Sequence, residues 1–172
     1  METWDAIRTR RNVRSFAERP IEAEHLDRIV AAAALAPSSM NEQRWAFVVC
    51  RERERLRRLA DTGDYAGHVA TAPAAIAFVT PRVGDPETRE SVAFDLGQSV
   101  ENAMLTAWDL GIGSCHASVY DEPLARQVLG YPDDLRCDMV VSFGYPAAPL
   151  APPGSHGGRK PLDRLRHDER FG

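Results

Sequence analysis

The chain has few cysteines, no long apolar run and no excess of positive charge. Its 172 residues carry 21 Lys and Arg against 25 Asp and Glu, a formal net charge of −4. Because nucleic-acid backbones attract basic surfaces, this balance argues against nucleic acid as the main partner. No apolar stretch approaches the roughly 20 residues that span a bilayer, and the amino-terminus lacks the apolar core of a signal peptide. We therefore expect a cytoplasmic protein that binds neither nucleic acid nor a membrane.

The residues of several common active sites are also missing. Cys50, Cys115 and Cys137 are an odd, widely spaced set that fits reduced thiols better than a disulfide framework. The five histidines form no H-E-x-x-H and the cysteines no C-x-x-C, so no metal site is expected. There is no G-x-S-x-G elbow either. An enzyme with this sequence would therefore depend on a cofactor for its chemistry.

Hydrophobic periodicity predicts a chain of alternating helices and strands. Apolar residues at helical spacing are clearest in the longest predicted helix, where Ser91 is a candidate N-cap and Gly111 a candidate stop. Short apolar runs with β-branched residues predict strands. The expected helices are 1–9, 21–35, 52–60, 91–110 and 121–129, and the expected strands are 45–50, 74–80, 114–119 and 139–143.

Two apparent motifs around the third predicted strand carry no function. Gly111-Ile112-Gly113 could open a G-x-G-x-x-G, but His116 takes the place of the third glycine and the motif follows a helix instead of a strand. Cys115 and His116 resemble a nucleophile and its base. Neighbours on a strand point to opposite faces, so these two side chains are not expected to meet.

No repeat or internal linker divides the chain, so residues 1–172 are expected to form a single domain. Residues 147–158 are rich in Pro and Gly, which predicts an extended carboxy-terminal arm over residues 147–172. The mixed order of helices and strands is compatible with a three-layer sandwich, although the pattern alone does not give the strand order.

Near the start of the chain, three guanidinium groups fall within five residues. Arg10, Arg11 and Arg14, with Asn12 among them, follow the first predicted helix. Guanidinium groups bind phosphate through a rigid fork of donors, so several could converge on one dianionic phosphate. A solvated basic turn explains the same cluster. The cluster alone leaves both interpretations open.

Two further polar segments have a functional and a plain interpretation. The loop between the second predicted helix and the first strand either binds polar ligand atoms or simply turns the chain. In the tail, Arg159 and Lys160 follow two glycines and either bring charge back onto an anion or belong to a frayed end. The loop residues in question are Pro37, Ser38, Ser39 and Asn41.

Taken in order, these segments resemble the FMN-dependent nitroreductase family over nearly the whole chain. The arginine-rich opening ends at Phe16 and is followed by Ala-Pro-Ser-Ser-Met-Asn-Glu-Gln-Arg-Trp at 36–45. Leu-Gly-Ile-Gly-Ser-Cys at 110–115, Val-Val-Ser-Phe-Gly-Tyr-Pro at 140–146 and Gly-Arg-Lys-Pro-Leu at 158–162 complete the series. No single motif is specific, but the ordered set is.

The resemblance implies an α+β fold, namely a nitroreductase-like three-layer sandwich with a central mixed or antiparallel sheet flanked by helices. It also implies an intertwined homodimer with FMN at the interface and NADH or NADPH as electron donor. The implied activity is reduction of nitroaromatic, quinone or similar electron-poor acceptors by ping-pong hydride transfer. Flavin N5 would do this chemistry, so no catalytic side chain is assigned. The alternative is a non-catalytic or specialised protein of the same fold that binds flavin or deazaflavin.

By the same resemblance, the FMN contacts come from four segments. The arginine-rich opening would hold the phosphate and part of the ring, and the tail would return to the phosphate. The polar loop would reach the flavin from the partner subunit, and the end of the third predicted strand would pass near flavin N5, mainly through backbone groups. The implied residues are Arg10, Arg11, Asn12, Arg14, Pro37, Ser38, Ser39, Asn41, Ala117, Ser118, Val119, Arg159 and Lys160.

Overall fold

The computed structural model describes residues 1–150 and 158–171, which form a four-stranded sheet, five α-helices and three short 3₁₀ helices. The strands are β1 (Ala46–Cys50), β2 (Ala74–Pro81), β3 (Gly113–Ser118) and β4 (Leu135–Gly144). The α-helices are α1 (Thr3–Thr9), α2 (Ala23–Ala34), α3 (Arg53–Ala60), α4 (Pro86–Asp109) and α5 (Glu122–Leu129). The 3₁₀ helices are η1 (Ser39–Asn41), η2 (Gly67–Thr71) and η3 (Leu162–Arg164).

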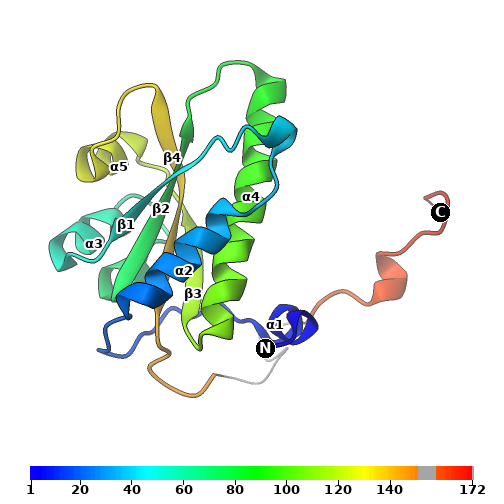
Figure 1. Cartoon of the computed structure of the whole chain (residues 1–172), viewed down its shortest axis with the longest axis horizontal. Helices are drawn as coiled ribbons and strands as arrows, with labels where there is room; N and C mark the ends of the chain where they lie inside the picture. The colour runs from blue at the N-terminus through cyan, green and yellow to red at the C-terminus, as the bar shows by residue number, and fades with distance from the viewer. Residues whose placement is uncertain (151–157, 172) are drawn as a thin grey trace.

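The sheet is the middle of three layers. Its strands run in the order β1-β2-β4-β3, and every neighbouring pair is antiparallel. Helices α2 and α4 cover one face, and α3, η2 and α5 cover the other (Figure 1). Because side chains alternate along a strand, the central strand β2 contributes to both cores. The α+β sandwich implied by the resemblance is confirmed.

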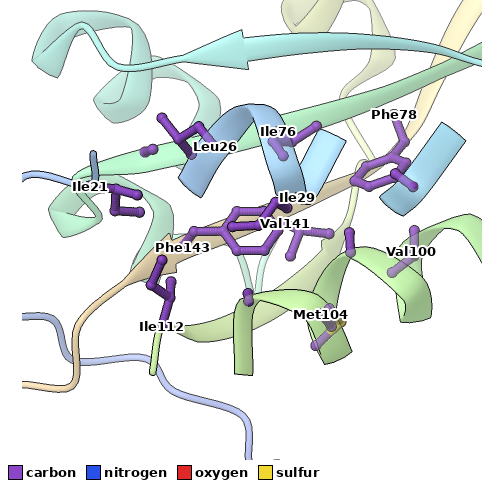
Figure 2. Packing of buried hydrophobic residues seen from close by; sticks show 14 of the residues in the cluster. Ile21, Leu26, Ile29, Ile76, Phe78, Val100, Met104, Ile112, Val141 and Phe143 are labelled. Carbon is purple, nitrogen blue, oxygen red and sulfur yellow. The ribbon is translucent and has the colours of Figure 1, made fainter. Parts of the chain in front are cut away.

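The larger core lies between the sheet and the helices α2 and α4. Ile76 and Phe78 from β2 meet Phe143 from β4 and Ile29 from α2, all four fully buried (Figure 2). The Phe47 ring packs edge-on against Phe78, with 5.3 Å between the ring centroids. Burying side chains of this size contributes about 1.5–3 kcal/mol each, so this core holds α2 and α4 on the sheet.

The opposite face carries a second, fully closed core. Leu56 and Leu59 from α3 pack with residues of β2, β4 and α5. Cys50 and Cys137 lie in this core as free thiols, and burial raises the pKa of Cys50 to about 11 and that of Cys137 to about 12. The prediction of reduced, unpaired cysteines is confirmed for the described residues, and these two thiols are protonated at neutral pH.

Helix α4 begins five residues earlier than the sequence predicts. Asp85 is the N-cap, and its carboxylate accepts a hydrogen bond of 2.8 Å from the Thr88 amide. The prediction of Ser91 as N-cap was wrong because the residues from 86 to 90 are polar and carry no hydrophobic repeat. The predicted stop is confirmed, since Gly111 has a φ of 75°, a conformation that glycine adopts at little cost.

Strand β4 also begins earlier than predicted, at Leu135 instead of Met139. The additional residues pair with the end of β2, so that Arg136 lies opposite Thr80. Arg136 and Asp138 interrupt the apolar run that marks the rest of the strand. They line a cavity instead of a core, which is why the hydrophobic pattern does not reveal them.

The predicted arm over residues 147–172 falls partly outside the described residues. Residues 158–171 are exposed throughout and include η3. Figure 1 shows this stretch extending away from the sheet and helices on the side of α1. In the described part of the chain, no helix is both long enough and apolar enough to cross a membrane.

Candidate functional site

A cavity of about 580 Å³ lies between α4 and the ends of β2, β3 and β4. Its wall on the helix side is a stripe of α4 that includes two small residues, Ala93 and Gly97. Larger side chains at these two positions would project into the cavity. The apolar side chains of the lining are Val83, Val92, Leu96, Val100, Met104, Val119 and Met139.

The end of β3 forms the opposite wall. His116, Ser118 and Val119 line the cavity, whereas Ala117 is almost fully buried in the core on the other face. Of the three predicted residues at this strand end, Ser118 and Val119 therefore line the cavity, and Val119 also packs against the core on the other face, to which Ala117 belongs. Cys115 is buried while His116 is exposed, which confirms that these neighbours point to opposite faces.

The arginine-rich segment lies against the outer edge of β3. The Val13 amide donates a hydrogen bond of 2.9 Å to the Ser114 carbonyl, and Val13 is buried. Gly113 permits this approach, because a Cβ atom there would lie only 2.4 Å from a Val13 methyl group. The segment is thus fixed to the strand through Val13, and the exposed side chains of Asn12 and Arg14 flank it.

Arg10 connects this segment to the cavity. Its Nε atom donates to a carboxylate oxygen of Glu101 at 3.1 Å, and its Nη1 atom donates to the Asn12 side-chain oxygen at 3.2 Å. Glu101 is one of the α4 residues that line the cavity. Arg10 does not line the cavity itself, but through Glu101 it lies beside one end of it.

Arg11 and Arg14 differ in what their guanidinium groups contact. Arg11 Nη1 turns back to the end of α1 and donates to the carbonyls of Thr9 at 2.6 Å and Arg10 at 2.9 Å. The Arg14 side chain is exposed and lies near the Cys115 thiol. Burial raises the pKa of that thiol, and the nearby guanidinium offsets part of the rise. Arg11 thus stabilises a helix end, which leaves Arg10 and Arg14 as the principal candidates for binding an anion.

A buried histidine beside Arg14 was not predicted. His68 Nδ1 lies 2.8 Å from the Ser142 hydroxyl oxygen, and that hydroxyl donates to the Cys115 carbonyl at 3.2 Å. Because the single hydroxyl proton goes to the carbonyl, Nδ1 is the protonated nitrogen of His68. Burial, the Arg14 charge and His116 lower the pKa of His68 to about 4, so the imidazole is neutral at physiological pH. A lone histidine in a short 3₁₀ turn gives no sequence signal for this arrangement.

The predicted polar loop is attached to α4. The Ser39 amide donates to the buried carboxylate of Asp95 at 2.9 Å, and the Gln98 side chain donates to the Pro37 carbonyl at 3.5 Å. Asn41 has a φ of 57°, which is a left-handed conformation that Asn tolerates better than most residues. The loop is therefore a shaped, anchored segment, and the Ser38 hydroxyl supports it by accepting from the Gln43 amide at 3.0 Å.

This loop cannot serve the cavity of its own chain. At 100° per residue, Asp95 and Gln98 lie on the face of α4 opposite to cavity-lining residues such as Gly97 and Val100. The helix therefore stands between the loop and the cavity. Figure 1 shows η1 near the amino-terminal half of α4, whereas α1 and the arginine segment that follows it lie near its carboxy-terminal end.

The two tail residues are also remote. Arg159 and Lys160 are exposed and belong to the stretch that extends away from the body in Figure 1. Within one chain, the structure places the arginine segment along the outer edge of β3, with Arg10 beside the Glu101 end of the cavity. It places the loop and the described tail elsewhere.

The residues around the cavity fit a phosphorylated, planar cofactor. Arg10 brings a guanidinium group to the Glu101 end of the cavity. The lining has the apolar side chains that a ring system requires. The buried Ser114 hydroxyl beside the arginine segment has no hydrogen-bond partner among the described residues. Buried hydroxyls without a partner are uncommon and mark a place where a ligand atom can bind.

Comparisons with known proteins identify the family. The chain is 35% identical to a protein of Archaeoglobus fulgidus named "Putative NADH dehydrogenase/NAD(P)H nitroreductase", over 84% of this chain and 86% of the relative. It is 24% identical to the FMN reductase (NAD(P)H) of Bacillus subtilis, over 72% of this chain and 51% of that protein. The fold matches an FMN-dependent nitroreductase from Clostridium difficile with a TM-score of 0.83 at 24% identity, covering 98% and 99% of the two chains. The family model for nitroreductases matches residues 7–63 and 61–145, so this chain belongs to the nitroreductase family.

Proposed function

We propose that the protein is an FMN-dependent oxidoreductase that takes electrons from NADH or NADPH and reduces small, electron-poor acceptors such as nitroaromatics or quinones. The observation that carries this proposal is the position of the arginine segment beside one end of an apolar cavity, joined to it by Arg10 and Glu101 at 3.1 Å. The names of the Archaeoglobus and Bacillus relatives support the choice of NAD(P)H and FMN. When bound, FMN supplies the hydride and electron transfer that the side chains themselves lack.

The chain's own residues bind the cofactor and set its electrostatic surroundings. Arg10, Arg14 and Asn12 would hold the phosphate and part of the ring, with Arg159 and Lys160 as further phosphate ligands. Arg14 would also stabilise negative charge that builds up on the ring during reduction. His68 lies near Arg14 and is neutral, so it adds no second positive charge there. The backbone at Ala117, Ser118 and Val119 would contact the reacting edge of the ring.

We further propose that two chains are needed for one complete site. The loop formed by Pro37, Ser38, Ser39 and Asn41 lies on the wrong face of α4 to serve its own cavity. In a two-fold dimer each loop could close the cavity of the partner subunit. The proposed assembly is therefore a homodimer with one FMN site near each end of the shared interface.

A complementation experiment tests this arrangement. One variant carries Arg14→Ala, and the other carries Ser38→Ala with Asn41→Ala; each alone is expected to lose FMN binding. Subunits from the two variants are then mixed and allowed to exchange. Random exchange makes half of the dimers mixed and gives each mixed dimer one intact site, so about one quarter of the sites should recover. No recovery would show that loop and arginines act within one chain.

The cavity is lined by the end of β3 and adjoins Arg10 through Glu101, so donor and acceptor are proposed to use it in turn. This predicts ping-pong kinetics. Initial rates measured at several fixed acceptor concentrations should give parallel double-reciprocal lines. Intersecting lines would show instead that donor and acceptor bind together.

The first test is the absorbance spectrum of the freshly purified protein, with the released chromophore identified by its mass. A flavin spectrum with the mass of FMN, together with oxidation of NADH or NADPH in the presence of an added acceptor, is the expected result. FMN binding without turnover would favour a binding protein of the same fold. A deazaflavin mass would keep the fold and change the cofactor, and a colourless protein that takes up no FMN would contradict the proposal.

A further inference from the structure

The cavity continues well beyond the residues predicted to meet the cofactor. Its lining on α4 runs from Met104, one turn beyond Glu101, to Arg89, which corresponds to about 22 Å along the helix axis. The Glu101 end lies beside the arginine segment. The Arg89 end lies at the first turns of α4, next to Pro81 and Val83 at the end of β2. The cavity thus has a cofactor end and a far end.

The charges at the two ends are not equally compensated. Four Arg, Asp or Glu side chains line the cavity, and three of them are paired. Glu101 pairs with Arg10, while Asp138 pairs with Arg136 and accepts a hydrogen bond of 3.5 Å from the Thr80 hydroxyl. In the described part of the chain, no carboxylate forms an ion pair with Arg89. The far end therefore carries one exposed, uncompensated guanidinium group.

Between the two ends the lining of the cavity is mainly apolar. Val92 and Leu96 form the helix wall, and Met139 and Val119 form the sheet wall. A flat aromatic ring fits such walls, and an attached anion would reach Arg89. Guanidinium groups bind carboxylates through two parallel hydrogen bonds.

We propose that the acceptor is an aromatic compound bearing a carboxylate or a similar single anionic group, and that Arg89 binds this group at the far end of the cavity. This inference rests on the proposed function and specifies the substrate class of the same site. Phosphate groups of the nicotinamide donor present the same anionic chemistry. The experiment below therefore measures donor and acceptor separately.

The test compares two probes of nearly identical shape, benzoate and benzamide, by calorimetry on the full chain loaded with FMN. We expect the unmodified protein to bind benzoate about tenfold or more tightly than benzamide, as a charge-assisted hydrogen bond predicts. Arg89→Gln should reduce this preference to about twofold or less. Arg89→Lys, which keeps the charge, should retain most of it.

Arg57→Gln is the matched control, because Arg57 is exposed on α3 on the opposite side of the sheet. It should leave the preference for benzoate unchanged. Equal binding of the two probes, or an unchanged preference in Arg89→Gln, would overturn the inference. The inference would also be overturned if Arg89→Gln raised the KM of NADH or NADPH and left acceptor binding unchanged. Calorimetry needs no turnover, so benzoate binding through Arg89 without NAD(P)H oxidation would reject the proposed reaction and keep the anion site.

Discussion

The two faces of the sheet are built from the same strands but serve different purposes. The face under α3 and α5 is a closed core in which even the thiols of Cys50 and Cys137 are buried. The face under α4 is equally tight near α2, yet it opens into a cavity over the ends of β2, β3 and β4. Helix α4 therefore packs against the core with apolar residues in one part and lines the cavity in another.

The comparison teaches where the chain can change without losing its fold. Substitutions on the closed face should affect stability and leave ligand binding intact, whereas substitutions at the cavity should do the reverse. His68 lies between these extremes, because it is buried on the closed side and yet adjoins Arg14. The following predictions test this division, beginning with the largest expected effect.

The sharpest separation is expected from Leu59→Ala on the closed face. Leu59 is fully buried against the second core, and its truncation should lower the free energy of unfolding by about 2–5 kcal/mol. Denaturant titration measures this loss, and FMN titration of the folded protein should give an unchanged Kd. A large change in FMN affinity would mean that the two faces are not independent.

The next effect concerns the pH dependence of stability. The pKa of His68 is about 4 in the folded state, below its usual 6.5. The neutral imidazole therefore stabilises the fold fully above pH 6.5, and this stabilisation is lost as the pH falls toward 4. We expect the free energy of unfolding to fall by about 2–3 kcal/mol between pH 7 and pH 4.5. Urea titrations at the two pH values measure the difference. His68→Gln should remove most of this dependence.

In the arginine segment, the two neighbouring arginines should behave differently. Arg14→Ala should weaken FMN binding by about 1.5–3 kcal/mol, the value of a charge-assisted hydrogen bond. Arg11→Ala should weaken it less, because one of its guanidinium nitrogens is already bonded to the carbonyls at the end of α1. Flavin titrations of both variants provide the comparison, and equal losses would show that Arg11 reaches the phosphate as well.

The smallest effect is a gain in stability at the cavity wall. A Cβ atom at Gly97 would meet nothing within 4 Å, so Gly97→Ala should raise the free energy of unfolding by about 0.5–1 kcal/mol through helix propensity. Gly63→Ala is the contrasting variant, because its Cβ would lie 2.4 Å from the Ser118 carbonyl oxygen. Thermal unfolding of both should show opposite signs. If Gly97→Ala lowered the free energy of unfolding, the added methyl group would be in contact with neighbouring atoms, and the cavity would not extend to this position.

Hydrophobic patterning predicted most of the elements because most of them bury an apolar face. It failed where an element borders the cavity. The polar first turn of α4 and the Arg136–Asp138 part of β4 face a space instead of a core, so they carry no hydrophobic repeat. The two boundaries that differ most from the prediction therefore belong to α4 and β4, which both line the cavity.

Some residues of the candidate site were predicted from the sequence, and others were not. The ordered series of motifs indicated the arginine segment and the end of β3. The end of β3 lines the cavity, and Arg10 of the arginine segment pairs with Glu101 in its lining. The loop and the tail remain predictions, since the loop would act on a second chain and the described part of the tail lies away from the cavity. His68 and Arg89 were missed because each is a single residue whose role depends on neighbours distant in sequence. Pairwise contacts of that kind leave no trace in composition or periodicity.

The position of the polar loop across α4 from its own cavity has a consequence for how activity depends on dilution. Under the proposed assembly, an isolated chain holds two incomplete halves of different sites and no working one. Below the dissociation constant of the dimer, the concentration of working sites would fall with the square of the chain concentration. Both sites of a dimer would be lost when it dissociates. The specific activity would therefore depend on the fraction of chains in dimers as well as on the rate of the reaction at each site.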